Sequence, residues 1–163
     1  DRYLRGGDHT PFNQLGMAAV RFCEVYENYD HQHQDVRVED GVQYGDLASY
    51  VDAQYLAGVT KLNTAVLVHL ANAPSTPADA RIITADLTND TTLRWTRSPE
   101  SDTAGYEVVW RATTDSDWTK FEDVGDTTEA TIDLSKDNWI FGVRAYDEEG
   151  YRSPVTYPYS ARE

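Results

Sequence analysis

The spacing of apolar residues changes near residue 78, and this change constrains the fold more than any other feature of the sequence. Between residues 55 and 71, apolar residues recur at steps of three and four, which is typical of a helix with one buried face. After Ala78, apolar and polar residues alternate in short runs separated by turns rich in Asp, Ser, Thr and Gly. The sequence therefore predicts two domains, residues 1–74 and 78–161, joined by a linker at residues 72–78.

The first half has an α/β pattern. Asp52 stands where an N-cap of the long helix belongs, and residues 10–16 predict a short helix with Pro11 in its first turn and Gly16 at its end. Within the apolar run at residues 17–25, the segment at residues 18–23 is short, mostly apolar and bounded by turn signals. Such a run predicts a strand that is buried on both faces of a parallel or mixed sheet.

The second half predicts an all-β sandwich, because many short strands with regular turns are typical of that architecture. In the run at residues 91–96, Leu93 and Trp95 share one face. Trp139, Phe141 and Val143 share a face in a later run, and both stripes are expected to point into the core. The seven expected strands are residues 80–87, 91–96, 106–112, 118–124, 130–134, 139–147 and 154–159.

Composition excludes several partners. The chain has 14 basic and 28 acidic residues, so its net charge of −14 repels nucleic acid and anionic membranes alike. With 40% hydrophobic residues the chain can form packed cores, but no stretch is long enough to predict a membrane span. We therefore expect a globular protein with neither nucleic acid nor membrane as a partner.

The sequence offers no nucleophile. Cys23 is the single cysteine, and its place in the apolar run at residues 17–25 predicts a buried structural thiol. The chain has neither a Gly-x-Ser-x-Gly elbow nor a Gly-rich phosphate loop.

The second half resembles a fibronectin type III domain over nearly its whole length. The residues that carry this resemblance are Thr-Leu-Arg-Trp at 92–95, Gly-Tyr-Glu-Val at 105–108 and Val-Arg-Ala-Tyr-Asp at 143–147. The family's corner tyrosine is missing, and Trp139 and Ile140 stand in its place, so the hydrogen bond of that corner is not expected.

The first half resembles the last portion of the co-catalytic di-zinc aminopeptidases, a family that includes glutamate carboxypeptidase II. Three segments carry this resemblance in order: Gly-Asp-His-Thr-Pro-Phe at 7–12, His-Gln-His-Gln-Asp at 31–35, and Val-Asp-Ala-Gln-Tyr-Leu at 51–56. The resemblance implies a bacterial protein and the incomplete C-terminal portion of an α/β, mixed-sheet zinc peptidase domain.

The resemblance also assigns roles to residues. It implies that His31 is a zinc ligand, since a neutral imidazole on a loop can be directed into a cleft, although a solvated loop histidine is the other interpretation. It implies that Asp8, His9 and Asp35 orient the site as partners of the ligands, and the two aspartates are equally explained as turn residues. Tyr29 is a candidate for stabilising an oxyanion.

Two further histidines receive no ligand role. His33 lies two residues after His31, so in an extended loop it points away and is expected to be solvated or to support the site indirectly. His69 lies on the long helix and is expected to pack.

The resemblance implies two zinc ions in the parent protein, which need about six ligands and a general base. Only His31 among these residues is a candidate ligand. The parent is therefore expected to be a hydrolase, a zinc-dependent aminopeptidase acting on peptides, and this C-terminal fragment alone is expected to be inactive. A signal upstream of Asp1 would make the parent secreted or periplasmic. The missing N-terminal part of the catalytic domain, or a homo-oligomer, is expected to cover the truncated sheet.

The alternative function is a non-catalytic module, related to the peptidase family, that binds protein or polysaccharide. Exposed aromatic residues of the sandwich would then form the binding surface. The candidates are Trp110, Trp118, Tyr151, Tyr157 and Tyr159.

Overall fold

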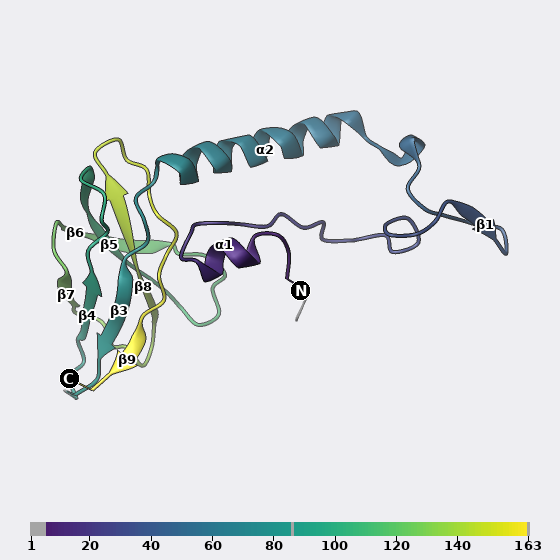
Figure 1. Ribbon diagram of the computed structural model, residues 1–163. Coiled ribbons are helices and arrows are strands. Elements are labelled where there is room, and N and C mark those ends of the chain that lie inside the picture. The colour runs from purple at the N-terminus through teal and green to yellow at the C-terminus, as the bar shows by residue number, and fades with distance from the viewer. Residues whose placement is uncertain (1–5, 86, 163) are drawn as a thin grey trace. The chain divides into compact units, whose positions relative to one another are not determined.

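The computed structural model describes residues 6–85 and 87–162 (Figure 1). These residues form two compact units. The first unit contains the described residues up to Ala19 together with those from Val68 onward. The second unit is formed by residues 20–67. The expected division into domains 1–74 and 78–161 stays a prediction.

Seven strands build the sandwich of the first unit. They are β3 (Ala78–Ile83), β4 (Thr91–Thr96), β5 (Thr103–Arg111), β6 (Lys120–Gly125), β7 (Glu129–Ile132), β8 (Ile140–Asp147) and β9 (Tyr159–Ala161). One sheet has the order β7-β4-β3-β9 and the other the order β6-β5-β8. All neighbours are antiparallel except β3 and β9, which run parallel. This is the all-β, fibronectin type III-like fold that the sequence predicts.

The core lies between the two sheets. Leu93 is fully buried and Trp95 is 5% exposed, and from the facing sheet Phe141 and Val143 pack into the same cluster. The predicted inward stripes are therefore confirmed. Tyr106 is fully buried as well, and its hydroxyl accepts a hydrogen bond of 2.9 Å from the Ser98 amide, so a large aromatic ring is accommodated without an unsatisfied polar atom.

Two strand predictions need correction. The last strand was expected at residues 154–159, but β9 begins only at Tyr159, and the preceding segment meets β8 through isolated bridges from Arg152 and Thr156. The strand expected at residues 80–87 ends at Ile83, and residue 86 lies outside the described residues. Residues 152–158 first contact β8 through single bridges, and the chain then pairs with β3 at β9. No continuous strand therefore forms along residues 154–158.

The two helices begin and end as the sequence predicts. α1 (Thr10–Gln14) has Pro in its first turn, and Gly16 beyond it has a φ of +77°. α2 (Ala53–Asn72) is capped by Asp52, whose Oδ1 accepts hydrogen bonds of 2.8 and 2.9 Å from the amides of Gln54 and Tyr55.

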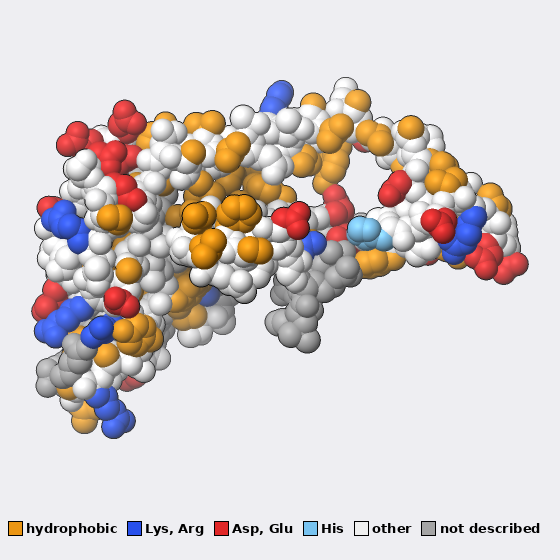
Figure 2. Space-filling model, in the orientation of Figure 1, with side chains coloured by type: hydrophobic (Ala, Val, Ile, Leu, Met, Phe, Trp, Pro, Cys, Tyr) orange, Lys and Arg blue, Asp and Glu red, His pale blue; other side chains and the backbone are white. Residues whose placement is uncertain are grey.

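The prediction that α2 has a buried face is wrong for the described residues. No residue of this helix is buried, and hydrophobic side chains lie on the surface along it (Figure 2). Leu56 and Leu62 are more than half exposed. Within the described residues, no helix is long and apolar enough to cross a membrane.

The strand expected at residues 18–23, within the apolar run at residues 17–25, is also wrong. These residues have no regular secondary structure, and Val20 and Phe22 are 50% and 41% exposed. Residues 6–77 are all described, and their only strands are β1 (Arg37–Glu39) and β2 (Val42–Tyr44), an antiparallel hairpin. A strand needs a partner for its backbone groups, and no strand among these residues pairs with the apolar run.

Candidate metal-ligand loop

The loop that carries His31 begins with a tight turn at Asn28. The Asn28 carbonyl accepts hydrogen bonds from the amides of His31, at 3.2 Å, and Gln32, at 3.1 Å. The Asn28 side-chain oxygen accepts another, of 3.0 Å, from the Asp30 amide. Asparagine commonly closes turns in this manner, so the local sequence itself fixes the start of the loop.

The loop is tied to the end of the β1–β2 hairpin at Gly45. The Gly45 amide donates a hydrogen bond of 2.9 Å to the Asp30 carbonyl. Gly45 is buried, has a φ of +92°, and lies so close to Val36 that an added Cβ would stand 2.6 Å from the Val36 Cα. Only glycine fits a left-handed backbone at such a close approach. This contact therefore holds the His31 loop against the hairpin.

The His31 ring is held by a stacked aromatic partner. Its plane lies nearly parallel to the Tyr50 ring, with 3.9 Å between centroids and an angle of 3°. The His31 Nε2 atom lies 3.5 Å from the Asn28 side-chain nitrogen. His31 is half-buried. An imidazole held by stacking on one face can still present a ring nitrogen to a metal.

The described residues do not complete a zinc site. Zinc in proteins takes three or four ligands from His, Cys, Asp and Glu. No group of three or more such side chains that could hold a metal occurs within residues 6–85 and 87–162. His31 can supply one ligand, and the described part of the chain does not bring three potential ligands together around it.

The other predicted residues of this loop have the following surroundings. His33 is exposed with a φ of 59°, and Asp35 is exposed. The Tyr29 hydroxyl donates a hydrogen bond of 2.8 Å to Glu27. The roles predicted for Asp35 and Tyr29 stay predictions.

Asp8 and His9 belong to the first unit, whereas His31 belongs to the second. Asp8 is exposed and His9 is half-buried at the start of α1. The His9 Nδ1 atom is buried and has no hydrogen-bond partner among the described residues. Their predicted supporting roles are not tested by this arrangement.

Cys23 is exposed, which corrects the expected buried thiol. It was predicted to be buried because its run was expected to be a central strand, and that strand is absent. Next to it, Glu24 accepts a hydrogen bond from the Tyr55 hydroxyl on α2, and this hydrogen bond raises the pKa of Tyr55. The one sequence signal for the Glu24–Tyr55 hydrogen bond is that Glu24 is a charged residue within an apolar run. The sequence gives no signal for the stacking of His31 on Tyr50.

The aromatic residues considered for a binding surface mostly contact other parts of the sandwich. Trp118 is half-buried, with its ring 5.3 Å from that of Tyr157 and the Arg111 guanidinium 5.2 Å above it. Trp110 packs against the core. Tyr157 and Tyr159 are 60% and 51% exposed.

Comparisons with known proteins agree with part of the peptidase resemblance. The chain is 53% identical over 159 residues to a probable zinc metalloprotease of Leptosphaeria maculans, a match that covers 98% of this chain and 37% of the relative. It is 49% identical to proteins of the same name from Pyrenophora tritici-repentis and Pyricularia oryzae, and each match covers 98% of this chain and 33% of the relative. The chain thus spans about a third of the length of these fungal relatives, and the bacterial di-zinc aminopeptidase assignment is not shown.

No protein-family model matches the chain. Among solved structures, the chicken CNTN1 FN1–FN3 domains align with a TM-score of 0.45 and 18% identity, covering 52% of this chain and 30% of that one. A myokine structure aligns with a TM-score of 0.39 and 20% identity, covering 54% of this chain and 90% of that one.

Proposed function

We propose that this chain is the C-terminal part of a secreted zinc metallo-exopeptidase that removes amino-terminal residues from peptides. The observation that carries the proposal is the match of almost the entire chain, at 49–53% identity, to proteins named probable zinc metalloproteases. The aminopeptidase specificity and the second zinc ion rest on the resemblance of the segments at residues 7–12, 31–35 and 51–56.

Within this proposal His31 is a ligand of one zinc ion. Its ring is positioned by the Tyr50 stack and its loop by the Asn28 turn and the Gly45 contact. Pre-positioned imidazoles bind zinc well, because little freedom is lost on binding. Zinc would supply a Lewis acid and an activated water. The remaining ligands and the general base would come from the part of the protein that this chain does not contain.

The test uses the full-length protein and two histidine variants. We expect His31→Ala to lower zinc content, measured by mass spectrometry of the purified protein, and to reduce hydrolysis of an aminoacyl p-nitroanilide by at least about 100-fold. His33→Ala, a change in the same loop, is the control and should leave both values close to wild type. Full zinc content and activity in the His31→Ala protein would refute the ligand role, and absence of aminopeptidase activity in the wild type would refute the function.

The proposal extends to a partner surface. Apolar side chains of α2 and of residues 17–25 are exposed, among them Leu56, Leu67 and Phe22. We propose that the remaining N-terminal part of the catalytic domain covers them, and that the isolated chain covers them by self-association. Light scattering of the isolated 163-residue chain should show oligomers; a compact, stable monomer would contradict this part.

We also propose that the protein is secreted. Since the relatives are fungal, an extracellular location is proposed in place of a periplasmic one. Immunoblotting of culture supernatant and cell extract from the source organism would decide it, and retention of the protein in the cells would contradict it.

A further inference from the structure

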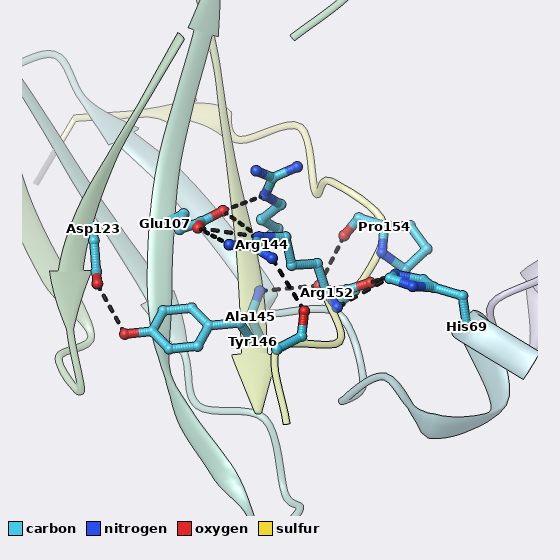
Figure 3. A network of polar contacts seen from close by, with 10 residues as sticks. His69, Glu107, Asp123, Arg144, Ala145, Tyr146, Arg152 and Pro154 are labelled. Carbon is cyan, nitrogen blue, oxygen red and sulfur yellow. Dashed lines mark hydrogen bonds and ion pairs between the residues drawn. The ribbon is translucent and has the colours of Figure 1, made fainter. Parts of the chain in front are cut away.

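The last turn of α2 makes a direct contact with the sandwich through His69. The His69 Nε2 atom lies 3.0 Å from the Arg152 carbonyl oxygen and 3.4 Å from the Arg152 amide nitrogen (Figure 3). A protonated Nε2 would donate to the carbonyl, and an unprotonated one would accept from the amide, so either tautomer finds a partner. The Tyr151 ring meets the His69 ring edge-on, with 5.5 Å between centroids.

The residue that His69 contacts is itself anchored to a sheet. The Arg152 guanidinium donates hydrogen bonds of 2.9–3.1 Å to the carboxylate of Glu107 on β5, whose side chain is 3% exposed. Arg144 on β8 donates another, of 2.6 Å, to the same carboxylate. Burial alone would raise the pKa of Glu107, but the hydrogen bonds from both arginines outweigh it and hold the pKa below its ordinary value. The carboxylate is therefore charged and fully engaged.

The turn that presents Arg152 is also fixed from within. The Asp147 carboxylate accepts hydrogen bonds from the amides of Glu149, at 3.0 Å, and Tyr151, at 2.8 Å. The Ser153 hydroxyl accepts one of 3.0 Å from the Ala145 amide, and Ser153 is only 4% exposed. His69 thus contacts a rigid, hydrogen-bonded turn.

The segment between α2 and β3 is held along its length by the sandwich. Ser98 donates a hydrogen bond of 2.7 Å to the Ser75 carbonyl, and Thr156 donates one of 2.8 Å to the Pro77 carbonyl. The Ser75 hydroxyl donates to Glu100. Pro74 and Pro77 are buried. In a flexible linker these carbonyl and hydroxyl groups would hydrogen-bond to water, whereas here each hydrogen-bonds to a residue of the sandwich.

We infer that the sandwich is a docking surface for the C-terminal end of α2, and that residues 72–78 belong to the sandwich's rigid unit and do not form a flexible linker. His69 and the Ser75–Ser98 contact are its two anchoring points. The function of the fibronectin type III-like domain in this chain is then to hold the C-terminal end of α2. This inference does not rest on the proposed function.

The test uses NMR of the 163-residue chain without zinc or substrate, so its outcome is separate from any peptidase activity. In wild type, ¹⁵N relaxation of Ser75 and Thr76 should give order parameters near those of β4, about 0.85. His69→Ala should speed hydrogen exchange of the Asn72 and Ala73 amides by about fivefold, the factor expected for one lost hydrogen bond. Order parameters below about 0.6 at Ser75 and Thr76 in wild type would overturn the inference.

Two matched variants complete the experiment. Ser98→Ala removes the contact to the Ser75 carbonyl and should lower the order parameters of Ser75 and Thr76 while the amides of β5 keep their protection. His33→Ala, an exposed histidine of the other unit, should change neither measurement. Unchanged exchange at Asn72 and Ala73 in His69→Ala would refute the anchoring role of His69, because the folded state of the sandwich is monitored in the same spectra.

Discussion

The sandwich and residues 20–67 contain similar apolar residues, but the sandwich buries them and residues 20–67 leave them exposed. Leu93 in the sandwich is fully buried, whereas Leu62 in α2 is 53% exposed. Gly45 is the one buried residue within residues 20–67, all of which are described. The sandwich closes a core because its two sheets bring their apolar faces together. An apolar stripe alone does not make a core, because a second surface must cover it.

Residues 20–67 are instead ordered by local polar and stacking contacts. The Asn28 turn, the Gly45 approach and the His31–Tyr50 stack are examples. Each contributes little compared with a packed core, since the net gain from one hydrogen bond is only about 1 kcal/mol. This difference predicts where substitutions will be costly and where they will be mild.

The largest expected effect is on the core. Leu93→Ala should lower the free energy of unfolding by about 2–5 kcal/mol, because it leaves a cavity between the sheets. Leu62→Ala is the matched change on exposed α2 and should cost less than about 0.5 kcal/mol in the isolated chain at a dilution where it is monomeric. Urea unfolding followed by tryptophan fluorescence measures the first change, since all four tryptophans lie in the sandwich, and far-UV circular dichroism follows α2 for the second. Equal losses would break the contrast between the two regions.

A smaller loss is expected for the buried carboxylate. Glu107→Gln should cost about 2–3 kcal/mol, because it leaves Arg144 and Arg152 without their shared anion. Glu129→Gln is the control: its carboxylate pairs with Arg94 at the surface, and surface pairs are worth at most about 1 kcal/mol. The same urea titrations measure both variants. If Glu107→Gln is as stable as Glu129→Gln, the ion pairs of Glu107 with Arg144 and Arg152 do not contribute to the free energy of unfolding.

In the second unit, the backbone at Gly45 is the expected weak point. Gly45→Ala should destabilise the hairpin by about 1–2 kcal/mol, through its positive φ and the contact with Val36. Gly41 also has a positive φ but open space around it, so Gly41→Ala should cost less. Hydrogen exchange at the hairpin amides would report the difference. Normal hairpin protection in the Gly45→Ala chain would mean that the loop tolerates a different backbone there.

The smallest effect is a pH dependence. The pKa of Glu107 is held below its ordinary value, so its contribution is complete above the unfolded pKa of about 4.3 and is lost as the pH falls through the lower folded pKa. Wild type should therefore lose more stability between about pH 5 and strongly acidic pH than Glu107→Gln does. Thermal unfolding across this range tests it, and parallel curves for the two proteins would exclude Glu107 as the source.

The similarity to zinc proteases could be predicted from the sequence, whereas the roles of the individual site residues stay predictions. The order of the segments around Asp8, His31 and Asp52 pointed to the zinc peptidases, and relatives named probable zinc metalloproteases agree with the zinc part of that prediction. Tyr50 could not be found, because it is distant from His31 in the sequence and only folding brings the two rings together. For the same reason the contact of His69 with Arg152, 83 residues away, was expected only as packing.

The sequence by itself determined the local events: the Asp52 cap, the ends of both helices and the alternating stripes that include Leu93 and Trp95. These depend on residues close together in the chain, whose chemistry acts at short range. Only the tertiary structure decided that residues 17–25 form no strand, that the last strand begins at Tyr159, and that α2 ends on the sandwich. Pairing and burial depend on which distant surfaces meet, and periodicity carries no information on that.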